Sequence, residues 1–269
     1  MKPFKAVFSD IDGTLLNDGH RVTPATARRI RSLARGGVPF ILVSARMPSG
    51  IFPIQEELGV LSPVICYGGA LILDAERRPL YSRGLSRSLA LKIKEKLPPE
   101  TPECCFCFYS NDLWIASDRL HPLVRREEEI TKVRAVSGSV EELLSPEAPV
   151  HKLLGFGPPE LLDETAARLR AAFPQCAVLK SAPGLLEIMD GSVSKSAALL
   201  ALCRILGISA GEAAAFGDNY NDIDMLKAAG LGVAMGNAPG EVKRAAGFVT
   251  RSNNEEGLLY ALNHFYGKE

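Results

Sequence analysis

Short apolar segments alternate with helix-like segments at both ends of this chain, and that alternation limits the possible fold more than any other feature. Residues 4–8, 38–43 and 64–67 are each typical of a buried strand. A helix is predicted between the first two, because Thr23 can cap its start and Pro24 suits its first turn. Parallel neighbours in a sheet need crossover connections, which are usually helices. The pattern therefore predicts an α/β fold with a Rossmann-like parallel-sheet core.

The pattern changes in the middle of the chain. Two predicted strands, 105–109 and 113–117, flank a turn-forming Asn-Asp pair, which favours an antiparallel hairpin. More helices and strands follow before the first pattern resumes. We therefore predict a discontinuous core, residues 1–82 and 190–269, interrupted by an inserted α+β domain at 83–189.

Charge and hydropathy exclude several classes of partner. Lys plus Arg number 31 and Asp plus Glu number 31, so the chain has no overall positive field to attract nucleic acid or an anionic membrane surface. No apolar run approaches the roughly 18–20 residues that span a bilayer, and the N-terminal segment turns acidic before a signal-peptide core could form. We predict a soluble, cytoplasmic protein with no nucleic-acid or membrane partner. The sequence specifies no oligomeric state.

Cysteine and histidine give no sign of a metal or redox centre. Several of the six cysteines lie in apolar runs, and the Cys-Cys-Phe-Cys cluster at 104–107 lacks the two-residue gap of a zinc knuckle. The four histidines are scattered without ligand spacing. We expect buried, reduced cysteines and structural or surface histidines.

Two carboxylates follow the first predicted strand. Asp10 and Asp12 lie one residue apart and precede Gly13, which permits a sharp turn. One carboxylate could attack phosphorus while the other moves protons, and carboxylate and backbone oxygens suit a hard Mg²⁺ ion. A solvated turn at the end of a strand is the alternative, since Asp and Gly dominate turns.

A second acidic cluster follows the predicted strand 213–216 and precedes a helix predicted at 221–229. Sites in open parallel sheets form at the carboxyl ends of the strands, so the two clusters can converge. Asp218 could then complete a magnesium site, and Asn221 could donate its amide to phosphate. Asp222 could bind water on the metal or serve as a helix cap.

Two more elements fit the same edge of the sheet. The Ser44 hydroxyl and backbone N–H groups near it, that of Ala45 included, could hold phosphate oxygens, or Ser44 could cap a turn. Arg46 could orient a leaving group or form a structural ion pair. Lys195, near a helix start, could place a positive charge on phosphate, or could be an ordinary surface charge.

These four elements, in this order, resemble the four motifs of the haloacid dehalogenase (HAD) superfamily, and its Cof-type phosphatases in particular. The features are SDIDGTLL, VSAR, Lys195 within VSKSAAL, and GDNYNDIDML, and the layout of GVAMGNAPGEVKRAAGFVTRSNNEEG is also similar. The resemblance implies a HAD-like core, with the insert as an α/β cap placed after the third strand.

The resemblance also implies a two-step mechanism. Asp10 attacks phosphorus to form an aspartyl-phosphate, while Asp12 protonates the leaving oxygen and later activates water. The phosphoryl group would be held by Ser44, Lys195 and Asn221. Magnesium would lie between Asp10, the Asp12 carbonyl and Asp218. Asp222, which could bind water on the metal, completes the predicted metal-site residues.

The predicted function is that of a Mg²⁺-dependent phosphatase acting on a small phosphorylated metabolite, with sugar phosphates foremost. Two alternatives stay open: a phosphomutase that passes the phosphoryl group to another hydroxyl, and a phosphometabolite-binding protein without turnover. The sequence departs from the branch at Gly68, where an asparagine often stands before the glycine of this loop. Gly68 has no side-chain amide, which affects the expected substrate more than the phosphoryl chemistry.

Overall fold

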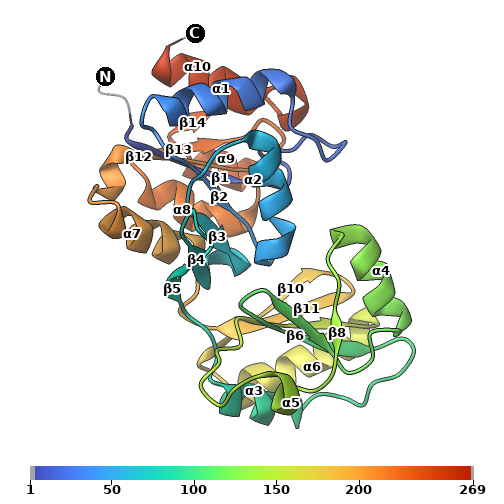
Figure 1. Cartoon of the computed structure of the whole chain (residues 1–269). Helices are drawn as coiled ribbons and strands as arrows, with labels where there is room; N and C mark the ends of the chain where they lie inside the picture. Colours follow the sequence, from blue (N-terminus) through green and yellow to red (C-terminus); the bar gives the residue numbers. More distant parts are fainter. Residues whose placement is uncertain (1–3, 268–269) are drawn as a thin grey trace. The chain divides into compact units, whose positions relative to one another are not determined.

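The computed structural model describes residues 4–267 of the 269-residue chain (Figure 1). The chain forms two compact units. The first contains the residues up to Arg46, Ile51–Tyr81 and the residues from Ser194 onward. The second contains Met47–Gly50 and Ser82–Val193.

The first unit is built on an eight-stranded sheet with the order β14-β13-β12-β1-β2-β3-β4-β5. Neighbours from β14 through β3 pair in parallel, whereas β3 and β4 pair antiparallel. The strands are β1 (Ala6–Asp10), β2 (Phe40–Val43), β3 (Val64–Cys66), β4 (Leu71–Leu73), β5 (Pro79–Ser82), β12 (Ala213–Gly217), β13 (Leu231–Ala234) and β14 (Phe248–Val249).

Helices pack on both faces of this sheet, with α1, α2 and α10 in one group and α7, α8 and α9 in the other (Figure 1). The helices are α1 (Pro24–Arg35), α2 (Phe52–Leu58), α7 (Lys195–Ile205), α8 (Ile223–Ala228), α9 (Gly240–Ala245) and α10 (Gly257–Tyr266). The start predicted for α1 is confirmed, because the Thr23 hydroxyl accepts a hydrogen bond from the backbone N–H of Thr26 at 3.2 Å. Short 3-10 turns complete the unit: η2 (Tyr67–Gly69), η3 (Ala210–Glu212), η4 (Tyr220–Asp222) and η5 (Asn253–Glu255).

The second unit has a six-stranded sheet with the order β10-β11-β9-β6-β7-β8, antiparallel except for the parallel pair β7–β8. Its strands are β6 (Cys105–Ser110), β7 (Leu113–Ala116), β8 (Val136–Ser137), β9 (Lys152–Phe156), β10 (Cys176–Ala182) and β11 (Leu185–Asp190). Its helices are α3 (Arg87–Lys94), α4 (Pro122–Thr131), α5 (Val140–Leu143), α6 (Pro159–Ala172) and the 3-10 turn η1 (Pro48–Gly50).

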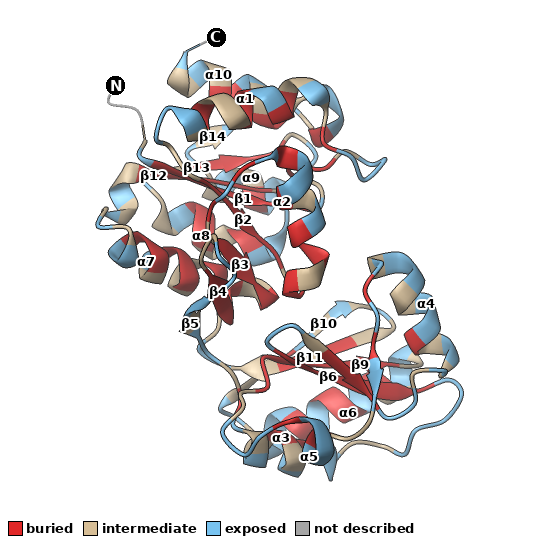
Figure 2. Cartoon of the chain, in the orientation of Figure 1, coloured by how far each residue is buried: buried red, intermediate tan, exposed pale blue. Residues whose placement is uncertain are grey.

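Each unit has its own apolar core (Figure 2). In the first, Phe8 and Ile41 from the sheet pack with Leu199 and Leu202 from α7. In the second, residues from α3, α5 and α6 pack with the sheet, where Phe106 is among the buried side chains. In each unit the helices pack an apolar face against the sheet and leave the opposite face to solvent. This arrangement is expected when both layers must bury an apolar face.

The predicted fold class is confirmed: a parallel α/β core is interrupted by an inserted α+β unit. Some local predictions are wrong. Tyr67 belongs to η2 rather than to the third strand, and the helix predicted at 221–229 is split into η4 and α8. The strands β4, β5 and β8 were not predicted.

Two further predictions, made from composition and hydropathy, concern the cysteines and membrane-spanning segments. All six cysteines are free thiols, and five are buried, as expected for core thiols. Across residues 4–267, no helix combines the length and the apolar character needed to cross a bilayer.

Candidate active site

The carboxyl ends of the central parallel strands bring the predicted motifs to one edge of the sheet. β1 lies between β2 and β12, and all three run in the same direction. The residues that follow them, Asp12, Ser44 and Asp218, therefore start from the same edge. This is the position where open α/β sheets place their ligands.

Three carboxylates gather there. Asp10, Asp218 and Asp222 each offer an oxygen, and these oxygens lie within 4.8 Å of one another. Asp10 is 8% exposed and Asp222 is fully buried. The sequence prediction that two clusters more than 200 residues apart converge is therefore matched by the positions of these side chains.

Lys195 is the cation of this cluster. Its Nζ donates to Asp10 Oδ1 at 2.6 Å and to Asp222 Oδ1 at 2.5 Å, and the residue is 2% exposed. The alternative that Lys195 is an ordinary surface charge is wrong. Lys195 is the first residue of α7, whose start is fixed by the Ser194 hydroxyl accepting from the backbone N–H of Ala197.

A glycine in η2 permits the close approach of this helix start. Gly69 has φ +117°, and a Cβ added there would lie 2.2 Å from the Ser194 carbonyl oxygen. Only glycine avoids that clash in that conformation. The loop after β3 thus helps to position Lys195, because the absence of a side chain at Gly69 lets the start of α7 approach.

The capping alternative for Asp222 is observed, whereas its predicted contact with water on the metal stays a prediction. Its Oδ2 accepts hydrogen bonds from the backbone N–H groups of Asp218 and Asn219 at 3.0 and 2.9 Å, which is the capping role. Its Oδ1 accepts from Lys195. The carboxylate therefore ties the loop after β12 to the start of α7.

Asp218 is oriented by two residues that sequence reasoning missed. Thr14 Oγ1 donates to Asp218 Oδ1 at 2.8 Å, and Asn237 Nδ2 donates to the Gly13 carbonyl at 2.9 Å and to Asp218 Oδ2 at 3.4 Å. Asn237 follows β13, the strand next to β12, so its place after a parallel strand was an available signal.

Burial and charge together set the protonation of this cluster. Burial raises the pKa of Asp10 to about 7, opposed by Lys195 and reinforced by Asp222. Burial likewise raises the pKa of Asp218 to about 6. Burial acts to lower the pKa of Lys195, but Asp10 and Asp222 outweigh it and raise that pKa above its ordinary value.

The donor set fits a hard divalent cation. Three carboxylates face a single ammonium group, so the cluster holds more negative than positive charge when ionised. Carboxylate oxygens are ligands that Mg²⁺ takes in proteins. The residues that could hold the ion are Asp10 and Asp218, with Asp222 adjacent.

Asp12 faces a different partner. Arg46 holds its carboxylate with two hydrogen bonds, from Nε to Oδ2 at 2.9 Å and from Nη2 to Oδ1 at 2.6 Å. The ion-pair alternative for Arg46 is therefore observed. The Asp12 side chain is 48% exposed and lies outside the three-carboxylate cluster, so its predicted metal contact rests on its backbone carbonyl and stays a prediction.

Ser44 and Ala45 form the turn between β2 and Arg46. Ser44 is 3% exposed, and its Oγ accepts from the Arg46 backbone N–H at 3.2 Å, so the turn-capping alternative is observed. Its predicted contact with phosphate, and that of the Ala45 N–H group, stay predictions. The same loop is fixed from the other side, because the Gly68 N–H donates to the Ser44 carbonyl at 2.8 Å.

Two predictions outside the cluster have different outcomes. Asn221 is exposed in η4, and its side chain forms no hydrogen bond with another residue of 4–267, so its phosphate contact stays a prediction. Gly68 has φ +62°, and an added Cβ there meets no atom within 4 Å. Glycine and asparagine both tolerate this left-handed conformation, so the loop keeps its shape without the family asparagine.

Comparison with known proteins identifies the family. A family model described as haloacid dehalogenase-like hydrolase matches residues 7–262. The chain belongs to the haloacid dehalogenase-like hydrolases. The resemblance inferred from the four motifs is thereby confirmed, and so is the hydrolase class.

Relatives of this HAD-like hydrolase match over nearly the whole chain. A Haemophilus influenzae protein named "Putative phosphatase" is 38% identical over 259 residues, covering 96% of this chain and 97% of that protein. The crystal structure of a haloacid dehalogenase-like hydrolase from Bacteroides thetaiotaomicron matches with a TM-score of 0.88 and 27% identity, covering 97% of this chain and 99% of the other. A structure described as a HAD subclass IIB sugar phosphatase matches with a TM-score of 0.77 and 25% identity, covering 98% and 100%.

Proposed function

We propose that this HAD-like hydrolase is a Mg²⁺-dependent phosphatase that releases phosphate from small phosphorylated metabolites, with sugar phosphates as its substrate class. One observation carries the proposal: Asp10 Oδ1 lies 2.6 Å from the buried Lys195 ammonium, inside a cluster with Asp218 and Asp222. A carboxylate placed beside a buried cation and a hard-metal site can attack a phosphoryl group whose negative charge would otherwise repel it. The description of one relative as a sugar phosphatase supports the substrate class.

In the first step, an Asp10 carboxylate oxygen forms a bond to phosphorus as the bond from phosphorus to the leaving oxygen breaks. Asp12 gives its proton to that leaving oxygen, so the alcohol departs neutral. Mg²⁺, when bound, supplies positive charge that screens the phosphoryl oxygens from the carboxylates. The product of this step is an aspartyl-phosphate on Asp10.

In the second step, Asp12 takes a proton from water, whose oxygen forms a bond to phosphorus. The Asp10–phosphate bond breaks, inorganic phosphate leaves, and both carboxyl groups return to their starting states. Arg46 orients Asp12 through its two hydrogen bonds. The phosphoryl oxygens would be bound by Ser44, the Ala45 N–H group, Lys195 and Asn221.

The test is phosphate release from a panel of phosphorylated metabolites, with and without Mg²⁺, by wild type and Asp10→Asn. Asp163→Asn is a matched control, because Asp163 also accepts from a lysine at 2.6 Å but is exposed and lies in the second unit. We expect Mg²⁺-dependent release in wild type and in the control, and none in Asp10→Asn. Equal release by Asp10→Asn and wild type would overturn the proposal, and isomerisation of a hexose 1-phosphate without release would favour a phosphomutase instead.

A further inference from the structure

A pocket in the second unit carries an excess of positive charge that its own residues do not neutralise. It has a volume of about 330 Å³ and is lined by Arg119, Arg125, Glu128, Glu129, Lys132 and Arg134. Four of these side chains are cationic and two are anionic. The chain as a whole has equal numbers of each, so this local excess does not follow from composition.

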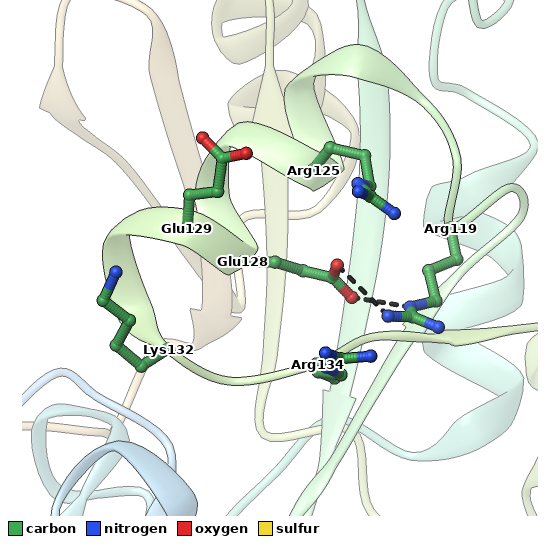
Figure 3. A pocket seen from close by; sticks show the side chains of 6 residues that line it. All are labelled: Arg119, Arg125, Glu128, Glu129, Lys132 and Arg134. Carbon is green, nitrogen blue, oxygen red and sulfur yellow. Dashed lines mark hydrogen bonds and ion pairs between the residues drawn. The ribbon is translucent and has the colours of Figure 1, made fainter.

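Three guanidinium groups reach toward one carboxylate in this pocket. Figure 3 shows the head groups of Arg119, Arg125 and Arg134 around Glu128, whereas Glu129 and Lys132 point away from it. Arg119 lies in the loop between β7 and α4, Arg125 lies on α4, and Arg134 follows that helix. The three cations therefore converge from separate segments of the chain.

The Glu128 carboxylate already accepts hydrogen bonds from two other residues. It accepts from Arg119 Nε at 2.7 Å and from the Ala135 backbone N–H at 2.8 Å. The bond from Arg119 is the first cause that holds the pKa of Glu128 below its usual range, so the group is anionic at neutral pH. Glu128 thus fixes Arg119 and the segment after α4, and its charge also attracts Arg125, so this one carboxylate faces three guanidinium groups.

Arg125 and Arg134 are exposed, and their guanidinium groups form no hydrogen bond or ion pair with any residue of 4–267. One carboxylate offsets only part of the repulsion among three converging guanidinium groups, and a further anion would offset the rest. A guanidinium is weakly hydrated and presents a planar fork of donors that matches the oxygens of phosphate. A pocket of this volume holds a small molecule rather than a folded partner.

We propose that Arg119, Arg125 and Arg134 form a binding site in the second unit for a phosphate group, either free phosphate or the phosphoryl group of a small metabolite. The residues of this pocket belong to the second unit, whereas those of the Asp10 cluster belong to the first. The proposal holds whether or not Asp10 is a nucleophile.

The experiment is an NMR titration of the ¹⁵N-labelled full-length protein with inorganic phosphate, without divalent metal, read at the arginine Nε–H signals. Single Arg→Gln variants assign those signals. We expect saturable shifts at Arg119, Arg125 and Arg134, and binding that weakens as salt is added, since the site is exposed. The readout is local to the pocket and does not require turnover at Asp10.

The double variant Arg125→Gln/Arg134→Gln tests the residues themselves. Loss of two charge-assisted contacts should weaken phosphate binding, read at Arg119, by about tenfold or more. Arg168→Gln is the matched control, because Arg168 is an exposed arginine on α6 of the same unit and lies outside the pocket. Equal affinity in the double variant and wild type would overturn the proposal, as would equal weakening by Arg168→Gln.

Two further arms separate the possible sources of the phosphate group. Tighter binding of glucose 6-phosphate than of inorganic phosphate would assign the site to an organic phosphate, and the reverse would assign it to free phosphate. Both results support binding of a phosphate group by the three arginines. Saturable shifts with a short RNA but none with either small anion would contradict it and indicate a nucleic-acid surface.

Discussion

Lys195 Nζ lies 2.5 Å from Asp222 Oδ1, and the two residues are 2% and 0% exposed. The same ammonium is 2.6 Å from Asp10 Oδ1. A buried cation between two buried carboxylates is expensive to assemble, and removing one partner leaves charge without compensation. The same three residues therefore affect both the stability of the first unit and the proposed reaction at Asp10.

Replacing Lys195 by methionine should destabilise the protein. Without the ammonium, Asp10 and Asp222 face each other in a buried site, and the expected loss in the free energy of unfolding is about 3–5 kcal/mol. Urea denaturation at pH 7.5 measures it. Lys180→Met is the matched control, because Lys180 Nζ also lies 2.6 Å from a carboxylate, that of Asp163, but the two side chains are 26% and 61% exposed. The control should lose less than about 1 kcal/mol, and equal losses in both variants would contradict the prediction.

Gly13→Ala should weaken the response to Mg²⁺. Gly13 has φ +82°, and a Cβ added there would lie 2.4 Å from Asp218 Oδ2, so the carboxylate must move. We expect a higher Mg²⁺ concentration for half-maximal phosphate release, together with a loss of about 1–2 kcal/mol in stability from the backbone alone.

Gly37→Ala separates the two effects. Gly37 has φ +84°, nearly that of Gly13, but an added Cβ there meets no atom within 4 Å. The control should share the loss of stability and keep the wild-type response to Mg²⁺. An unchanged Mg²⁺ response in Gly13→Ala would show that Asp218 does not depend on this close approach.

Asp12→Asn should divide the reaction into its two steps. An asparagine cannot protonate a leaving group or activate water, and loss of general acid-base catalysis typically costs about 10²–10⁴ in rate. Nitrophenolate leaves without protonation, so p-nitrophenyl phosphate should still give a rapid burst of one nitrophenolate per enzyme, followed by slow turnover.

Rapid-mixing absorbance measures the burst, and an alkyl phosphate, whose leaving group needs the proton, should give neither burst nor turnover. Asp10→Asn is the control and should lack the burst with both substrates. Wild-type turnover of the alkyl phosphate by Asp12→Asn would remove Asp12 from the proposed role.

The sequence was sufficient for the parallel part of the first sheet because those strands are short, apolar and followed by polar residues. Asp10 and Asp218 were found for the same reason, since Asp10 ends β1 and Asp218 directly follows β12 in the parallel part of the sheet. The strands that escaped prediction have weak local signals: β8 has two residues, and β5 is largely exposed. Such strands are defined by pairing with neighbours that are distant in the sequence.

The state of Lys195 could not be predicted from its surroundings in the sequence. A lysine at a helix start is usually solvated, and its burial here depends on Asp10, 185 positions away, and on the close approach of Gly69. Asn237 was missed for a related reason, because its place after a strand shows which edge of the sheet it lies at but not its hydrogen bonds to Gly13 and Asp218. Long-range contacts of single side chains are the part of a site that local patterns leave undetermined.

His151 should make the stability of the protein depend on pH in the acidic range. The residue is fully buried, its Nδ1 accepts from the Asn111 N–H at 3.0 Å, and its Nε2 lies 2.9 Å from the Ser82 hydroxyl. Burial lowers the pKa of His151 from 6.5 to about 4. Between these values the unfolded chain binds a proton that the folded chain does not, so stability should fall as pH falls from about 6.5 to 4.

At about 1.4 kcal/mol per pKa unit, the contribution of His151 to this loss is roughly 3 kcal/mol. The free energy of unfolding, measured in urea from pH 7.5 to 4.5, gives the slope. His151→Gln cannot take up that proton, so it should start with lower stability at pH 7.5, because its packing is altered, and lose less on acidification. Parallel curves for wild type and His151→Gln would mean that the acid dependence comes from other groups.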